Sequence, residues 1–333
     1  MKLRNGLALL LAMVLLCGCA GAEGISSGQT YSPGLALAAG EVYCLGKNVG
    51  LGFIPIWRVG MEGMEKVRSR IGGWSGLYAV DDGLMTIEPV LNIGEILGSI
   101  PTSTCQVNHF DPVTGKTREL TTRVRNEESG VCEAFAAQGK AYRDVHAGND
   151  HMLQRLDDGE WVTVAQWTGD HVWMYESFCF IGSRHEDKPE YVALYEFSTG
   201  KVYDVTAFVR KHSLTTSAWE AVLEDGVLYL LQDGAMMTVE LSTGREEKLG
   251  DLPKGVSCFI LTDTQMILMS NEKKMAWVLD RSSWKVVSQV NMTVFPQTVL
   301  LHEGRLYVHC LLIEAKMEII DLTTGESAKY SLE

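Results

Sequence analysis

The segment VELSTGREEKL, residues 239–249, decides the fold because close variants of it recur along the chain. Each copy reads as an apolar strand, a tight turn and a second strand, and a glycine at the position of Gly244 supplies the positive φ angle that a short hairpin needs. Turns of this family fall at Gly115, Gly159, Gly200, Gly244, Trp284 and Gly325, with a weaker copy at Gly63. The six stronger copies are spaced by 40 to 44 residues. A fixed period of this length indicates a repeat architecture.

A second family of hairpins alternates with the first, as in EDGVLYLL at residues 224–231. Its turns are expected at Gly40, Gly83, Gly139, Ser177, Gly226, Thr264 and Gly304. Two interleaved families give four strands per period of about 42 residues, which is typical of a β-propeller blade. Residues 34–333 number 300, which suffices for seven blades of about 43 residues.

We therefore predict an all-β fold, a seven-bladed β-propeller of four-stranded antiparallel blades. A β-sandwich is the alternative, because its strands also recur every 8 to 12 residues, but it does not explain two turn families at a constant offset. Only Val90–Leu97 shows a trace of helical periodicity, so we expect little helix.

The hairpin Asp321-Leu322-Thr323-Thr324-Gly325 resembles the Asp-x-x-Thr-Gly-Lys turn in the blades of quinoprotein-like and Tol-system propellers of prokaryotes. The resemblance covers nearly the whole chain after its N-terminal segment. It implies a propeller that binds a cofactor, scaffolds an envelope assembly or, like some members of these families, has no known role. Trp161 and Trp284 occupy unrelated positions in their repeats, which departs from the regular tryptophan pattern of quinoproteins, so we expect no cofactor.

The N-terminus has the layout of a bacterial lipoprotein signal. Lys2 and Arg4 precede an apolar run at residues 7–16, followed by Cys17-Gly18-Cys19. Ten apolar residues are too few to span a bilayer core of about 30 Å as a helix, so they indicate a signal peptide. Leu16 and the three residues after it resemble a lipobox, which implies cleavage before Cys19 and acylation of that cysteine, with palmitate among the acyl groups.

These features divide the chain into a signal peptide at residues 1–18, a flexible tether at residues 19–33 and the propeller at residues 34–333. A plain signal peptide cut near Ala20 or Ala22 is the alternative. Acyl chains would hold the protein on the extracytoplasmic side of the cell membrane.

The charge of the mature chain argues against two classes of partner. Loss of residues 1–18 removes two positive charges, so the net charge falls from −13 to −15. Such a body is repelled by anionic headgroups, and its scattered basic residues do not form the footprint that nucleic-acid binding needs.

Propeller topology predicts where a site lies. With strands A to D in each blade, the turns quoted above lie on one face, here called the hairpin face, while B–C loops and D–A connections lie on the opposite loop face. Glu88–Thr104 is expected as an insertion of roughly ten residues there, and Arg143–His151 and Gly182–Glu190 as irregular loops. The candidate ligand-binding residues are Trp74, Asp144, His146, Asp150, His151, Trp167, His171, His185, Glu186, Asp187 and Trp219.

We expect this loop face to bind a protein or a polymer such as a polysaccharide, because tryptophan supplies a large contact area with few torsions to freeze. The alternative is that the tryptophans wedge between blades. A metal site at His146, Asp150 and His151 lacks a third certain ligand, so no metal is expected. No phosphate-binding, metalloprotease or serine-nucleophile motif is present, so we name no catalytic residue.

Two other functions remain open, a hydrolase or lyase acting on carbohydrate and a subunit of a membrane complex. An enzyme should show carboxylates with raised pKa values converging on one mouth of the channel, whereas a binding module should show an aromatic or apolar patch. The cysteines of the body lie in different blades within apolar segments, so we expect free buried thiols. They are Cys44, Cys105, Cys132, Cys179, Cys258 and Cys310.

Overall fold

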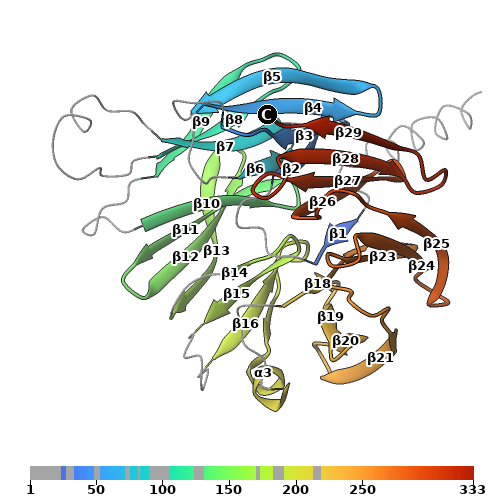
Figure 1. The fold of residues 1–333 in the computed structure, drawn as a ribbon. Coiled ribbons are helices and arrows are strands. Elements are labelled where there is room, and N and C mark those ends of the chain that lie inside the picture. The colour runs from blue at the N-terminus through green and yellow to red at the C-terminus, as the bar shows by residue number, and fades with distance from the viewer. Residues whose placement is uncertain are drawn as a thin grey trace, which may run out of the picture.

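Seven antiparallel sheets form a ring around a central axis (Figure 1), which confirms the prediction of a seven-bladed β-propeller with four-stranded blades. The structure is a computed structural model. It describes residues 24–27, 34–48, 53–71, 76–81, 83–89, 105–123, 131–169, 173–182, 191–212 and 219–333.

The first four blades follow one another along the chain, each from strand A to strand D. They comprise β2 (Leu35–Ala38), β3 (Glu41–Leu45), β4 (Phe53–Gly60) and β5 (Gly63–Ile71); β6 (Leu77–Val80), β7 (Gly83–Pro89), β8 (Cys105–Phe110) and β9 (Thr117–Arg123); β10 (Val131–Ala137), β11 (Lys140–Ala147), β12 (Asp150–Asp157) and β13 (Glu160–Thr168); and β14 (Trp173–Met174), β15 (Phe178–Gly182), β16 (Val192–Glu196) and β17 (Val202–Asp204).

The last three blades continue the same order. They comprise β18 (Ala221–Glu224), β19 (Val227–Gln232), β20 (Ala235–Glu240) and β21 (Arg245–Asp251); β22 (Cys258–Leu261), β23 (Gln265–Ser270), β24 (Met275–Asp280) and β25 (Lys285–Asn291); and β26 (Thr298–His302), β27 (Arg305–Cys310), β28 (Lys316–Asp321) and β29 (Ser327–Ser331). Every turn predicted from the repeats joins neighbouring strands of one of these sheets or begins the second of them.

Five of the C–D hairpins share a construction that explains their acidic residue. In the seventh blade, Thr323 N and Thr324 N donate to Asp321 Oδ1 at 2.9 and 2.8 Å, and Gly325, at φ 76°, donates its N–H to Asp321 O. The same backbone bond closes four other hairpins, from Gly115 to Asp111, Gly200 to Glu196, Gly244 to Glu240 and Trp284 to Asp280. The acidic side chain of the motif is thus a turn-forming group.

The interior lies between blades. One cluster joins Ile260 and Met269 of the sixth blade to Leu306 and Val308 of the seventh. Burial of one such side chain is worth about 1.5–3 kcal/mol, and a single sheet can obtain it only against the next sheet. The ring closes between the seventh and first blades, where Lys47 N donates to Leu332 O at 2.8 Å.

One expectation about the loops is corrected. Arg143–His151 is not an irregular loop, because β11 and β12 run through it and only Gly148 and Asn149 separate them. Its polar side chains pair across the sheet instead.

A short helix, α3 (Thr206–His212), follows β17. Its start is fixed by a hydrogen bond from Thr206 N to Asp204 Oδ1 at 2.9 Å. The sequence did not reveal this helix, because seven residues are too few to show a helical period. Val90–Leu97 lies outside the described residues.

Part of the expected tether is ordered. Residues Ile25–Ser26 form β1, which pairs antiparallel with β22 as a fifth strand of the sixth sheet, on the axial side of the ring (Figure 1). Among the residues that the structure describes, no helix has the length and apolar character to cross a membrane.

The cysteines whose side chains are described are all free. Cys44, Cys179 and Cys310 are buried, and Cys258 is half-buried. Burial raises the pKa of the Cys258 thiol to about 12, which keeps it protonated and unreactive near neutral pH. The side chains of Cys105 and Cys132 lie outside the described set.

Candidate functional site

The candidate residues of the third blade form a column of stacked rings near the loop face. His146 on β11, His151 on β12 and Trp167 on β13 are direct cross-strand partners. The two imidazole centroids lie 4.7 Å apart, and the centroids of His151 and Trp167 lie 5.0 Å apart with planes inclined by 9°. His146 is half-buried and ends the column on its more exposed side.

A buried carboxylate fixes the middle ring of this column. Asp144 is 5% exposed and His151 is 4% exposed, and His151 Nδ1 lies 2.9 Å from Asp144 Oδ2. The hydrogen bond orients the imidazole and satisfies the carboxylate in a site that water scarcely reaches. The indole Nε1 of Trp167 is buried and has no hydrogen-bond partner in the described part of the chain. The sequence predicts these residues as ligand-binding candidates but assigns them to loops, whereas the structure has them on strands.

The remaining candidates divide into three groups. Asp150 is exposed at the B–C turn and accepts a hydrogen bond from Thr168 Oγ1 at 2.8 Å. Trp219 is 5% exposed and packs edge-to-face on Phe180 at 4.6 Å, so its ring serves the interface of the fourth and fifth blades. Trp74, His171, His185, Glu186 and Asp187 lie outside the described residues. No group of three metal-ligating side chains occurs among the residues that are described.

An axial site that the sequence did not reveal surrounds β1. Ser26 N donates to Glu176 Oε2 at 2.8 Å, and Ser27 Oγ donates to Glu220 Oε2 at 2.8 Å. Ser27 is fully buried and also binds two inner strands, because Phe259 N donates to its Oγ and its carbonyl oxygen accepts from Ala221 N. Three blades therefore hold two serine residues of the N-terminal segment.

The two glutamates of this site are half-buried and have altered acidity. Burial raises the pKa of Glu176 from 4.5 to about 7, and the hydrogen bond from Ser26 only partly opposes it. Burial likewise raises the pKa of Glu220 to about 7 against the bond from Ser27. Both carboxyls thus titrate near neutral pH. Their positions, at the A–B turn of the fourth blade and just before β18, carried no motif that could have singled them out.

An exposed apolar tip stands on the loop face of the seventh blade. Leu312 is 66% exposed and Ile313 is 68% exposed in the B–C turn between β27 and β28. The Gln297 side chain fixes the turn, because its Oε1 accepts hydrogen bonds from Leu311 N and Leu312 N, both at 3.1 Å. Leu312 and Ile313 are more exposed than the other neighbouring pair of exposed apolar side chains in the described residues, Val286 and Val287.

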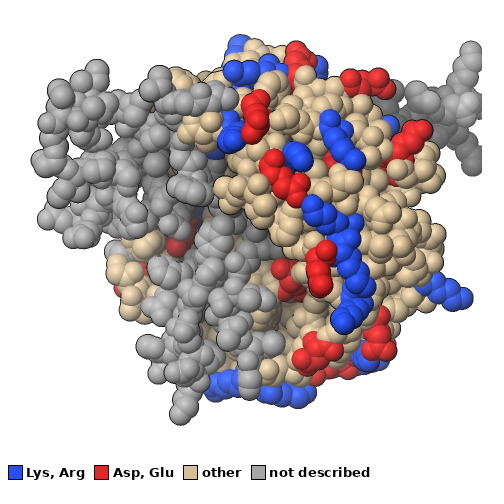
Figure 2. Space-filling view, viewed as in Figure 1, with Lys and Arg blue, Asp and Glu red and all other residues tan. Residues whose placement is uncertain are grey.

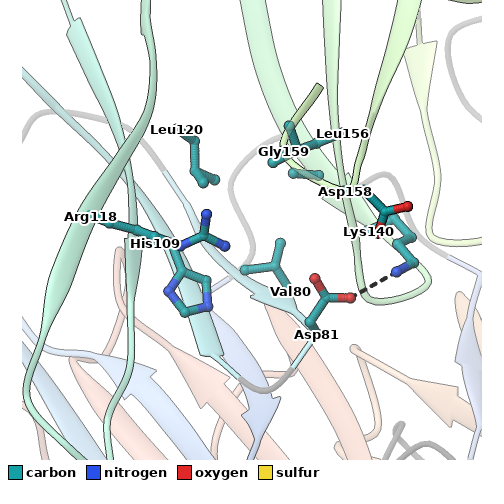
Figure 3. Close-up of a pocket in the computed structure, with 10 residues that line it drawn as sticks. Val80, Asp81, His109, Arg118, Leu120, Lys140, Leu156, Asp158 and Gly159 are labelled. Carbon is teal, nitrogen blue, oxygen red and sulfur yellow. Dashed lines mark hydrogen bonds and ion pairs between the residues drawn. The ribbon is translucent and has the colours of Figure 1, made fainter. Parts of the chain in front are cut away.

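A cavity of about 350 Å³ lies between the second and third blades on the hairpin face. Figure 3 shows the Arg118 side chain beside the His109 ring on one side, while Lys140 reaches Asp81 on the other at 2.9 Å. Asp158 also lines the cavity. The two cations face two carboxylates, so the cavity has no strong selectivity for ligands of one charge.

Charges of both signs are interspersed on the face seen in Figure 2, where a short row of Lys and Arg is flanked by Asp and Glu. Such a surface does not concentrate a field of one sign over the visible area.

No family model matches this chain, and neither does any curated protein. Solved structures do match it. An uncharacterized protein from Listeria monocytogenes has a TM-score of 0.53 at 10% identity over 93% of this chain and 95% of that one. A candidate 6-phosphogluconolactonase from Bacteroides uniformis has a TM-score of 0.50 at 10% identity over 87% and 95%. Hsv2 from Kluyveromyces lactis has a TM-score of 0.50 at 8% identity over 93% and 100%.

At these identities the likeness shows the β-propeller fold alone. The finer resemblance to quinoprotein-like and Tol-system propellers stays a prediction.

Proposed function

We propose that the chain is a lipid-anchored binding or scaffolding module on the extracytoplasmic side of the cell membrane, and that a partner protein docks on its loop face. The Leu312-Ile313 tip carries the proposal, because an exposed apolar pair on a fixed turn is what the binding interpretation requires. The lipobox-like Leu16-Cys17-Gly18-Cys19 supports the anchor.

Docking of a protein on an apolar tip is physically reasonable because removal of about 100 Å² of apolar surface from water contributes about 2.5 kcal/mol. The hydrogen bonds from Gln297 hold the backbone of the tip, so little ordering cost opposes binding. The half-buried ring of His146 offers a second contact on the same face. A protein that spans the third and seventh blades would use both.

A pair of matched double variants tests this function. Leu312→Ser with Ile313→Ser removes the tip, and Val286→Ser with Val287→Ser removes another exposed apolar pair, which is 53% and 57% exposed on β25. Cross-linking in intact cells, followed by mass spectrometry, identifies the partner, and titration of that purified partner compares affinities. We expect the first variant to weaken binding at least tenfold and the second to leave it unchanged. Equal affinity of the first variant and the wild type would refute the docking site.

A second candidate, a hydrolase or lyase acting on carbohydrate, is favoured by one observation. Glu176 and Glu220 meet the same two-residue segment, and their pKa values of about 7 suit acid–base catalysis at neutral pH. In the structure Ser26 and Ser27 occupy the two carboxyls, so a substrate would have to displace this segment. Cleavage of envelope polysaccharide by the wild type, lost in Glu176→Gln, would favour the enzyme over the binding module.

A further inference from the structure

The strand β1 attaches the N-terminal segment to the ring at a fixed place. Its pairs are Ile25 with Leu261 and Ser26 with Ile260 of β22. Ser27 N continues this ladder by donating to Phe259 O at 2.9 Å. With the bonds to Glu176 and Glu220, the segment is held by the fourth, fifth and sixth blades.

The direction of β1 determines the face on which the chain leaves the ring. β22 is an A strand, so it runs from the loop face to its A–B turn on the hairpin face. β1 is antiparallel to β22, so its N-terminal end, at Ile25, lies at the hairpin face. Gly24 agrees with this direction, because a Cβ atom there would lie 2.9 Å from Thr262 Cγ2 in that turn.

The length of chain between Cys19 and the ring is short. Five Cα–Cα steps separate Cys19 from Gly24, and five residues span at most about 18 Å. A body of about 300 residues has a radius of gyration of about 19 Å. Starting near the axis, the segment is too short to carry Cys19 around the rim to the loop face.

We propose that β1 is the joint between the lipid and the propeller, and that it holds the hairpin face against the bilayer with the loop face directed away from it. This inference rests on the acylation of Cys19 proposed above. The net charge of −15 leaves the acyl chains, and not a basic surface, as the attraction to the membrane. The Leu312-Ile313 tip, on the loop face, would then point toward partners outside the membrane.

Energy transfer to a lipid-bound acceptor measures this orientation. The acylated full chain, with Cys258→Ser to remove the half-buried thiol, is labelled with a donor at either of two exposed turn positions. Ser242→Cys reports the hairpin face, and Asn149→Cys reports the loop face. In vesicles of zwitterionic lipid with acceptor on the headgroup, we expect transfer from position 242 to exceed that from 149 about twofold or more, because the hairpin face is held within about 18 Å of the bilayer.

A linker variant separates the joint from other causes. Insertion of about 20 Gly/Ser residues between residues 23 and 24 adds a root-mean-square reach of about 25 Å and leaves β1 intact. We expect it to keep the protein on vesicles and to abolish the difference between the two donors. A difference that persists in this variant would overturn the proposal, because the orientation would then not depend on the short segment.

Flotation of the same samples with vesicles distinguishes failure of the joint from failure of the anchor. In one outcome, the protein floats only when Cys19 is present and yet shows equal energy transfer from both donors, or more from position 149. This result refutes the orientation but not the lipid anchor. Protein that does not float refutes the anchor and, with it, the proposal.

Discussion

At the scale of single residues, the molecule places polar groups where the repeat alone does not require them. Asp144 is buried with one partner among the described residues, His151, and the two sit beneath the half-buried ring of His146. A buried polar group of this kind is tolerated only when it is hydrogen-bonded. The sequence could nominate these residues by type, but their pairing depends on the register of β11 and β12.

Replacement of His151 should reveal the cost of the buried carboxylate. His151→Ala leaves Asp144 without its described partner, and we expect the free energy of unfolding to fall by about 3 kcal/mol or more. His146→Ala removes only the outer ring and should lower it by about 1 kcal/mol. Urea denaturation of both variants checks this difference. Adding Asp144→Asn to His151→Ala should recover part of the loss, and losses of equal size in the two single variants would show that Asp144 does not depend on His151.

The axial glutamates should make stability depend on pH. Below pH 4.5 both carboxyls are protonated in the folded and the unfolded chain. Between pH 4.5 and about 7 only the unfolded chain ionises, so rising pH favours unfolding, and the loss is complete above the folded pKa of about 7. After allowance for partial exposure, the loss is about 2 kcal/mol for each carboxyl.

Urea midpoints at pH 5 and pH 8 measure this dependence. The double variant Glu176→Gln with Glu220→Gln keeps an oxygen acceptor for both serine donors but cannot ionise, so its midpoint should change less between the two pH values. A wild type whose stability is as high at pH 8 as at pH 5, or a double variant with the same pH dependence as the wild type, would contradict the raised pKa values.

At the scale of elements, the hairpins could be predicted from sequence because each turn has a local cause. A left-handed residue closes the C–D hairpins of the second to seventh blades, and in the sixth blade that residue is Trp284 at φ 56°, where the other four hairpins with the same backbone bond have glycine. The side chain of Trp284 at this turn packs against a residue of another blade. A Cβ atom on Gly250 of the fifth blade would lie 1.9 Å from Trp284 Nε1, so glycine makes room for the indole ring.

A double-mutant cycle tests this contact between blades. Gly250→Ala should lower the free energy of unfolding by about 2 kcal/mol, because the ring of Trp284 would be displaced from its packing. In the Trp284→Gly background the ring is gone and the turn has its usual glycine, so the same change should have almost no effect. The coupling energy from urea denaturation is the readout. A cost of Gly250→Ala that is equal in both backgrounds would show that the close approach to the ring does not matter.

At the scale of the whole molecule, the repeat predicted the ring, the number of blades and both faces, because each sheet can bury its apolar sides only against its neighbours. It did not predict β1. A strand of two residues is too short to show a periodic pattern. The hydrogen bonds of this segment also join residues that are far apart in the sequence, such as Phe259 N and Ser27 Oγ, which are separated by 232 positions. Small polar residues there indicated a tether, and only the ring as a whole supplies the partners that order them.

An engineered disulfide between β1 and the ring tests the account most directly. Ile25 and Leu261 are direct antiparallel partners, and such pairs have the Cα separation that a disulfide needs. In the Cys258→Ser background, Ile25→Cys with Leu261→Cys should oxidise almost completely in the folded protein, as read by mass spectrometry of peptides. Ile25→Cys with Leu37→Cys, on the innermost strand of the first blade, should not oxidise to this bond. Absence of the first cross-link, or equal yields of both, would contradict the seating of the N-terminal strand on the sixth blade.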